Sequence, residues 1–316
     1  MDATFKLPVL LAYPYMKGEA TLAILRQYRG AYRLIVDSGA FTAWRSGKPI
    51  DLDAYCRFLD SIEDLRPFNA VQLDVFGDPV ATRRNFITMK GRGYDVMPVF
   101  TRGDSLDALD ELYSVAPYVM FGGITTGKAN RAYVNAFMRR NAGRPVHLLG
   151  FTDLDYIKTY RPTSVDASSW RSAHRWGSLA CYVGMGKTVK IDRTKFVDKP
   201  DDDIIEALRR NGATSDMIAA LGKQAAWRNT GKFIRGHVES TAAFVSTLAA
   251  ISQAADIERG TGTVYYLACP GGTHLRDLLR AFSHWRTHSG YAGRGSTQEP
   301  RVGRNELPDR VRPDSP

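Results

Sequence analysis

Short apolar runs alternate with amphipathic segments along most of the chain, and this alternation limits the possible fold more than any other feature. The runs are too short for helices and rich in Val, Ile, Leu and aromatic residues, which is typical of buried strands. The predicted strands are 9–13, 33–37, 70–75, 95–100, 118–124, 146–151, 163–166 and 264–269. The helices predicted between them are 52–65, 79–91, 105–114, 129–141 and 154–160, with Asp51 and Asp104 as N-caps.

About eight strands separated by helices indicate parallel strands joined by crossover helices. We therefore predict an α/β fold of the (β/α)8 TIM-barrel type. A doubly wound open sheet is the alternative, but the first predicted strand runs into LAYPYMKGEA and lacks the glycine-rich nucleotide-binding turn.

The alternation breaks once, between the seventh and eighth predicted strands. Residues from about 190 to 258 have helical patterns there and are predicted to form a largely helical insertion. The predicted organisation is one TIM-barrel domain over residues 1–289, which includes this insertion, followed by a flexible basic tail over 290–316. The tail is rich in Gly, Pro, Arg and Asp and has almost no apolar content, which is typical of a flexible segment.

Composition bears on compartment and partners. Of the 316 residues 44% are hydrophobic and 24% charged, so we expect a soluble protein with no membrane span and no secretory signal. Cys56, Cys181 and Cys269 are far apart and odd in number, which favours buried thiols in the cytoplasm, or the host cytoplasm if a phage carries the gene. The net charge of +10 favours a polyanionic partner such as a nucleic acid.

Three predicted strands place an aspartate at the same rim: Asp37, Asp74 and Asp166. Any one of them could cap a helix or close an Asx turn. Carboxylates that meet repel each other, so their pKa values separate and one keeps a proton while another stays ionised. That arrangement suits displacement at a sugar C1′, where one carboxylate attacks and another handles the proton of the base.

Two glycine-rich stretches approach phosphate-loop spacing without meeting it. GGITTGKA has Ala129 where a Ser or Thr should hold magnesium, and the stretch ending in GMGKT has Cys181 in place of the first glycine. The sequence therefore does not favour an ATPase. Gly122 and Gly123 are interpreted instead as bare backbone that lets a flat ligand approach, and His147 as a packed residue.

Two basic segments are candidates for nucleic-acid contact. Arg171, His174 and Arg175 follow Asp166 closely and suit a phosphate, although a solvated basic loop explains them equally well. In the predicted insertion, a second set combines one aromatic residue with three cations: Trp227, Arg228, Lys232 and Arg235.

The motifs resemble a known family. VDSGAF is similar to the D-S-G-G-F/Y signature of the queuine-type tRNA-guanine transglycosylases, and FGGITTG to their G-G-L-A-x-G strand. HLLGFTDLDYIKTYRPTSVDASSW resembles the stretch that leads to their nucleophilic aspartate, and the order and spacing agree over roughly residues 30 to 175. With LDVFGDP and SVDASSW, the pattern is closer still to the phage-type branch of 7-deazaguanine DNA-modification proteins often called DpdA.

The resemblance implies a role for several residues. Asp166 matches the nucleophile, Asp37 the general acid and base, and Asp74 the residue that reads the N–H edge of the purine. Phe41 matches the residue that stacks beside the purine base. The residues implied in substrate binding are Asp74, Ser38, Gly39, Phe41, Thr101, Gly122, Gly123, Ile124 and Gly150.

The chain also departs from the tRNA enzymes. Their glutamine-glycine-glycine loop is FTRG here, which leaves that work to Thr101 or Arg102, and their zinc site of three cysteines and a histidine is absent. The resemblance thus implies a DNA-guanine transglycosylase that needs no metal or other cofactor. Its partners would be double-stranded DNA and a free 7-deazaguanine base, the 7-cyano form preQ0. The exchange would proceed through a covalent aspartyl-C1′ intermediate.

Three alternatives remain at this point. The nearest is a zinc-free tRNA-guanine transglycosylase acting on tRNA. The others are a catalytically inactive barrel that binds nucleic acid or a modified base, and a barrel glycosidase acting on small sugars. The sequence leaves the oligomeric state and the DNA context open.

Overall fold

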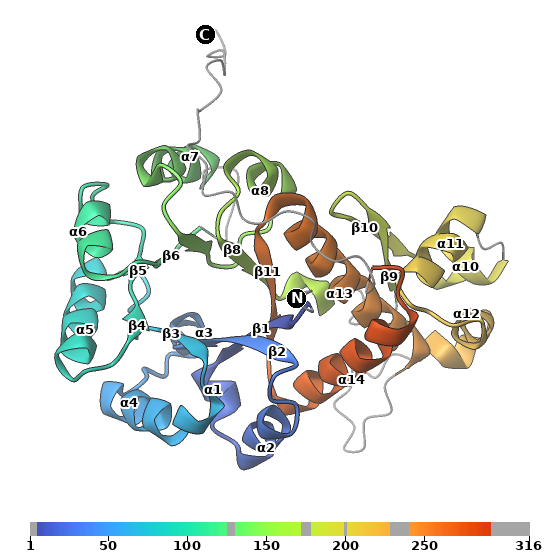
Figure 1. The fold of residues 1–316 in the computed structure, drawn as a ribbon, viewed down its shortest axis with the longest axis horizontal. Coiled ribbons are helices and arrows are strands. Elements are labelled where there is room, and N and C mark those ends of the chain that lie inside the picture. Colours follow the sequence, from blue (N-terminus) through green and yellow to red (C-terminus); the bar gives the residue numbers. More distant parts are fainter. Residues whose placement is uncertain (1–4, 125–129, 172–177, 199–200, 228–239, 292–316) are drawn as a thin grey trace, which may run out of the picture.

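The computed structural model describes residues 5–124, 130–171, 178–198, 201–227 and 240–291 (Figure 1). Within them, a nine-stranded parallel sheet has the order β4-β3-β2-β1-β11-β8-β7-β6-β5. Its strands are β1 Leu7–Ala12, β2 Tyr32–Asp37, β3 Phe68–Val71, β4 Val96–Met97, β5 Val99–Phe100, β6 Val119–Phe121, β7 Val146–Leu148, β8 Ser164–Ala167 and β11 Val264–Cys269. The predicted α/β class is confirmed.

The two edges of the sheet meet at Pro98. β4 pairs with β3 and β5 pairs with β6, and Pro98 alone separates β4 from β5. Proline has no N–H to donate, so the strand assignment is interrupted there. Met97 and Val99 nevertheless belong to one inner cluster while Val96 and Phe100 belong to the outer core, as expected for one continuous extended segment. The sheet is therefore barrel-like.

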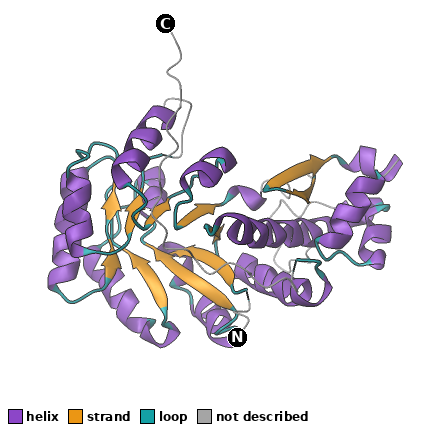
Figure 2. Ribbon diagram, turned by 45° about the horizontal axis from the view of Figure 1, so that its top comes forward, coloured by secondary structure: helices purple, strands orange, loops and turns teal. Residues whose placement is uncertain are grey.

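Helices cover the outer face of the sheet (Figures 1 and 2). They are α1 Tyr13–Met16, α2 Glu19–Gln27, α4 Leu52–Ser61, α5 Pro79–Gly91, α6 Ala108–Val115, α7 Asn130–Asn141, α8 Leu154–Tyr160, α13 Thr241–Thr261 and α14 Gly272–His288. A further helix, α3 Ala40–Ser46, follows the carboxyl end of β2. Asp51 caps α4 by accepting the Ala54 N–H at 2.7 Å, as predicted. The prediction for Asp104 is wrong, because its carboxylate turns back and accepts the Thr101 N–H at 2.8 Å.

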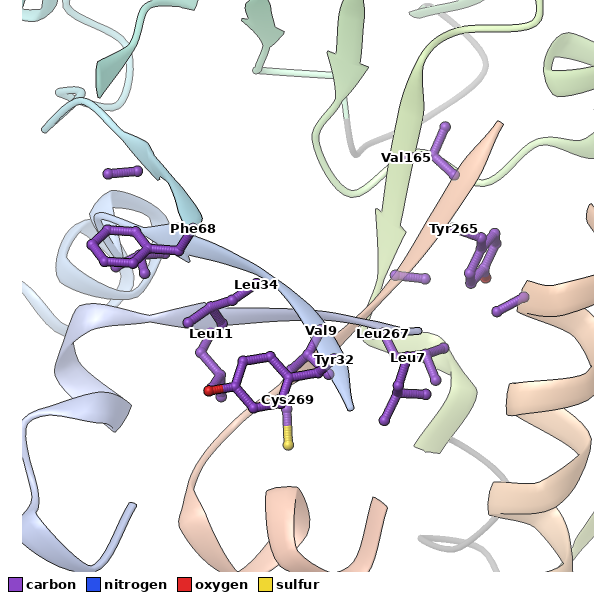
Figure 3. Close-up of a cluster of buried hydrophobic side chains, with 14 of the residues drawn as sticks. Leu7, Val9, Leu11, Tyr32, Leu34, Phe68, Val165, Tyr265, Leu267 and Cys269 are labelled. Carbon is purple, nitrogen blue, oxygen red and sulfur yellow. The ribbon is translucent and has the colours of Figure 1, made fainter. Parts of the chain in front are cut away.

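Alternate residues of the strands face opposite sides. One set packs against the helices in the larger core, part of which is drawn in Figure 3, where Val9, Leu34 and Val165 are labelled. The other set forms a smaller cluster on the opposite, inner face of the sheet: Leu10, Ile35, Val71, Met97, Val99, Met120 and Tyr266. Because strand side chains alternate, the inner residues show which polar side chains also point into the barrel.

The segment between β8 and β11 builds a separate cluster of buried residues, which we call the insertion cluster. It contains η2 Ser169–Arg171, β9 Leu179–Gly184, β10 Lys187–Ile191, α10 Arg193–Asp198, α11 Asp202–Arg210, α12 Ser215–Leu221, η3 Gln224–Trp227 and the start of α13. Helices were predicted here, but the antiparallel β9–β10 hairpin was not. α13 contributes to two groups of buried residues, since Val245 packs in the insertion cluster and Ile251 packs in the larger core against the sheet.

Trp227 was expected on a nucleic-acid surface, and this expectation is wrong. The indole is buried in the insertion cluster and donates its N–H to the Leu221 carbonyl at 2.6 Å. The three cysteines are buried and none forms a disulfide, in agreement with the prediction of buried thiols. Among the described residues, no helix combines the length and apolarity needed to cross a bilayer. Residues 292–316 of the predicted tail lie outside the described residues.

Candidate active site

Three carboxylates gather at the carboxyl end of the strands. Asp37 is the last residue of β2, Asp166 lies in β8, and Asp74 comes three residues after the end of β3. Asp37 is two residues beyond inward-facing Ile35, so the alternation of the strand points it into the barrel. Asp166 pairs in register with inward-facing Tyr266 and points the same way.

The three aspartates interact electrostatically. Burial raises the pKa of Asp37 to about 7, and the negative charges of Asp74 and Asp166 contribute to the rise. Burial also raises the pKa of Asp74. The hydrogen bond from Ser38 Oγ to Asp74 Oδ1, at 2.8 Å, lowers this pKa and so partly opposes the rise. The structure therefore brings Asp37, Asp74 and Asp166 together, and Asp37 exchanges a proton near neutral pH.

The turn after β2 is built around Asp37 and Gly39. The Gly39 N–H donates to Asp37 Oδ2 at 3.0 Å, so Asp37 also closes an Asx-type turn. Gly39 has φ 84°, and a Cβ there would lie 2.5 Å from Pro14 Cδ. Glycine is required at this position by the turn and by the close approach of Pro14, which explains it without contact to a substrate.

Asp166 ends a chain of buried polar side chains. Its Oδ1 accepts the Gly150 N–H at 2.6 Å and lies 3.2 Å from His147 Nε2. On the other side of the imidazole, His147 Nδ1 is hydrogen-bonded to Ser164 Oγ, which is also bonded to the Tyr118 hydroxyl. His147 is fully buried in β7, Ser164 and Asp166 lie in β8, and Tyr118 lies just before β6.

The donors in this chain follow from its end. A carboxylate oxygen only accepts, so His147 donates its Nε2–H to Asp166. When the imidazole is neutral, with its proton on Nε2, its Nδ1 accepts, and Ser164 then donates to His147 and accepts from Tyr118. The chain therefore holds one Asp166 oxygen between the His147 and Gly150 N–H groups and leaves the other oxygen outside these two bonds.

Replacing His147 by Phe is expected to lower the free energy of unfolding by about 1–3 kcal/mol, because Ser164 and Asp166 each lose a buried partner. Urea titration measures this loss. The same substitution made beside Asp166→Asn should cost less, since a hydrogen bond to a charged acceptor is the stronger one. Equal costs in the two backgrounds would contradict the bond to Asp166.

The glycines after β6 serve the protein itself. A Cβ on Gly122 would lie 3.3 Å from Val99 Cγ1, and one on Gly123, which has φ 73°, would lie 3.1 Å from Arg102 Cβ. At Gly123 the positive φ and the nearby Arg102 favour glycine without any ligand, whereas at Gly122 a Cβ would only need Val99 to shift slightly. Gly150, implied in substrate binding, donates its N–H to Asp166 instead.

The remaining sequence-predicted residues differ in accessibility. Thr101 and Ile124 are buried, Ser38 is buried against Asp74, and Phe41 is 45% exposed on α3. The predicted nucleic-acid contacts are not placed: His174, Arg175, Arg228, Lys232 and Arg235 lie outside the described residues, as does the side chain of Arg171.

His147 is the residue that sequence reasoning missed. It was interpreted as a packed residue, and it is packed, but its ring also holds Asp166. A signal for this exists in the strand itself, because Val146 and Leu148 on either side face the helices and so direct His147 inward.

Among the described residues, no three His, Cys, Asp or Glu side chains are grouped as metal ligands. Comparison of the chain with protein-family models, with curated proteins and with solved structures found no match.

Proposed function

We propose that this protein is a guanine transglycosylase that exchanges guanine in DNA for a 7-deazaguanine base, preQ0 (7-cyano-7-deazaguanine), through a covalent intermediate on Asp166. The observation that carries the proposal is the pairing of two unlike carboxylates. Asp37 has a pKa raised to about 7, while Asp166 is held by the N–H groups of Gly150 and His147. One group suits proton transfer and the other suits nucleophilic attack.

The fold supports this assignment. We count β4 and β5 as one strand interrupted by Pro98, which makes the barrel the eight-stranded TIM type. In that architecture the reaction centre lies at the carboxyl ends of the strands, where Asp37, Asp74 and Asp166 are found.

The proposed reaction has two displacements. In the first, a carboxylate oxygen of Asp166 bonds to C1′, the bond from C1′ to N9 of guanine breaks, and Asp37 gives its proton to the departing base. In the second, N9 of the incoming 7-deazaguanine gives its proton to ionised Asp37 and bonds to C1′, which releases the Asp166 oxygen. Asp37 regains its proton, and two inversions retain the configuration of the sugar carbon.

DNA must present the guanine outside the helix for this chemistry. The C1′–N9 bond of a stacked base cannot be reached by groups at a barrel mouth, so the nucleotide has to be flipped out. The net charge of +10 supports a grip on phosphates around that nucleotide. Phe41, exposed at the start of α3, is the proposed neighbour of the flipped base.

The function is tested by incubating the full chain with plasmid DNA and preQ0, and with tRNA and preQ0 in parallel. Mass spectrometry of the nucleosides should show the 7-cyano-7-deazaguanine deoxynucleoside in the DNA sample. Incorporation into tRNA alone would replace the proposal by the zinc-free tRNA enzyme. Incorporation into neither polymer, with guanine, preQ0 and 7-aminomethyl-7-deazaguanine each tried as the free base, would reject exchange.

Asp74 is proposed to read the N–H edge of the base. A carboxylate accepts from both the amide and the amino group of guanine, so Asp74→Asn should weaken binding of free preQ0 by about 10-fold or more, equivalent to about 1.5–3 kcal/mol for a hydrogen bond to a charged group. Calorimetric titration measures the affinity. Asp107→Asn is the matched control, since it makes the same change at a side chain that is 93% exposed. Unchanged affinity in Asp74→Asn would contradict this role.

A further inference from the structure

Three aromatic side chains gather on the rim beside the candidate active site. Phe41 and Trp44 lie on α3, and Phe76 lies in the loop between β3 and α5. The ring centroids of Trp44 and Phe76 are 4.4 Å apart at an interplanar angle of 34°, and Phe41 is 5.7 Å from Phe76 and 5.8 Å from Trp44. We refer to Phe41, Trp44 and Phe76 as the rim aromatic cluster.

Two of the three side chains in the cluster are exposed, and Phe76 is half-buried, although all three are large and apolar. Phe41 is 45% exposed and Trp44 is 56% exposed. Neighbouring exposed aromatic side chains are a common mark of a binding surface, because leaving them in water is unfavourable. Their place in the chain is also informative: Phe41 is four residues beyond Asp37, and Phe76 is two residues beyond Asp74. The cluster therefore follows closely, along the chain, on two of the three aspartates of the candidate site.

Cations accompany the aromatic rings. The Arg45 guanidinium lies 5.9 Å from the centroid of the Phe41 ring, and Lys48 is exposed just after α3.

We propose that the rim aromatic cluster stacks an unpaired nucleobase adjacent to the exchanged guanine, with Trp44 as the main platform. A flat exposed indole offers a π-face to any base, and nearby cations match the phosphates that a nucleic-acid strand brings with its bases. The occupant is therefore one locally unpaired strand rather than an intact duplex. This inference rests on the proposed function, because it extends the path of the substrate from the site of exchange.

Two synthetic eight-unit strands test the inference: oligothymidylate, and an abasic phosphodiester of the same length and charge. Binding is followed by fluorescence anisotropy with Asp166→Asn as the parent protein, so that no exchange interferes. Trp44→Ala should weaken oligothymidylate binding about 5- to 150-fold, as expected for loss of one base–aromatic stack. It should leave abasic binding unchanged, whereas Trp44→Phe should retain most of the affinity for oligothymidylate.

A charge variant completes the design. Arg45→Gln should weaken both strands by a similar factor, because it removes a phosphate contact and no stack. Equal affinity of Trp44→Ala and its parent for oligothymidylate would overturn the inference. So would a change in sedimentation of Trp44→Ala alone, which would assign the cluster to contact between copies of this chain. If stacking is found but no polymer is modified by the unaltered protein, the proposed function fails while the surface stands.

Discussion

Replacing Asp166 by Asn is expected to lower base exchange by about 10⁴-fold or more, the size of loss seen when a nucleophile is removed from an enzyme. The amide has the shape of the carboxylate, and its oxygen still accepts the N–H groups of Gly150 and His147. It lacks the charge and basicity needed to attack C1′. Incorporation of labelled preQ0 into plasmid DNA measures the rate, and circular dichroism checks that the variant is folded.

The covalent intermediate gives a second measurement of the same substitution. Incubated with labelled DNA in the absence of a free base, the unaltered protein should form a species that survives denaturing electrophoresis, and Asp166→Asn should not. Asp107→Asn is the matched control, because its side chain is 93% exposed beside the start of α6 and pairs only with Arg140 among the ion pairs described. Exchange by Asp166→Asn at the normal rate would remove the covalent scheme.

Much of the barrel follows from short-range patterns. Each predicted strand overlaps an observed one, because apolar runs bounded by helical patterns have few other places to be buried. The pattern of apolar runs did not predict the break between β4 and β5 at Pro98. This break arises because proline lacks an N–H within a continuous extended segment.

The β9–β10 hairpin shows a different kind of failure. Its turn runs through Gly184 and Gly186, with Met185 between them at φ 54°. These are turn residues flanked by two β-rich runs, a pattern that indicates a hairpin. In the sequence the same letters, GMGKT, were weighed only as a phosphate loop and rejected, so their value as a turn signal was not used.

The candidate site was partly predictable. Strand ends locate Asp37 and Asp166 on one rim, since parallel strands share a carboxyl end. A separation of pKa values was expected for carboxylates that meet, but the pKa of about 7 for Asp37 was not, because it depends on burial and on charges brought from other strands. The link from Tyr118 through Ser164 to His147 joins β7, β8 and the residue just before β6, and only the register of the sheet brings these residues together.

Replacing Asp37 by Asn is expected to lower exchange by about 10²- to 10⁴-fold, the usual contribution of a general acid and base. The pH profile identifies the cause. Formation of the proposed covalent intermediate requires protonated Asp37, so in the unaltered protein its single-turnover rate should level off below pH 7, as long as Asp166 stays ionised, and fall tenfold per pH unit above it. Asp37→Asn should have a low rate without this fall.

Stability provides a test of Asp37 that needs no substrate. Its pKa is about 7 in the folded protein against 3.8 as the ordinary value, so the stability linked to its proton is complete below pH 4 and is lost as pH rises towards 7. Asp37→Asn carries no such charge. Its melting temperature should therefore match the unaltered protein at pH 4 and exceed it at pH 8, while Asp107→Asn shows no such divergence. A constant difference across this range would mean that Asp37 is not the buried, proton-holding carboxyl on which the two-displacement reaction depends.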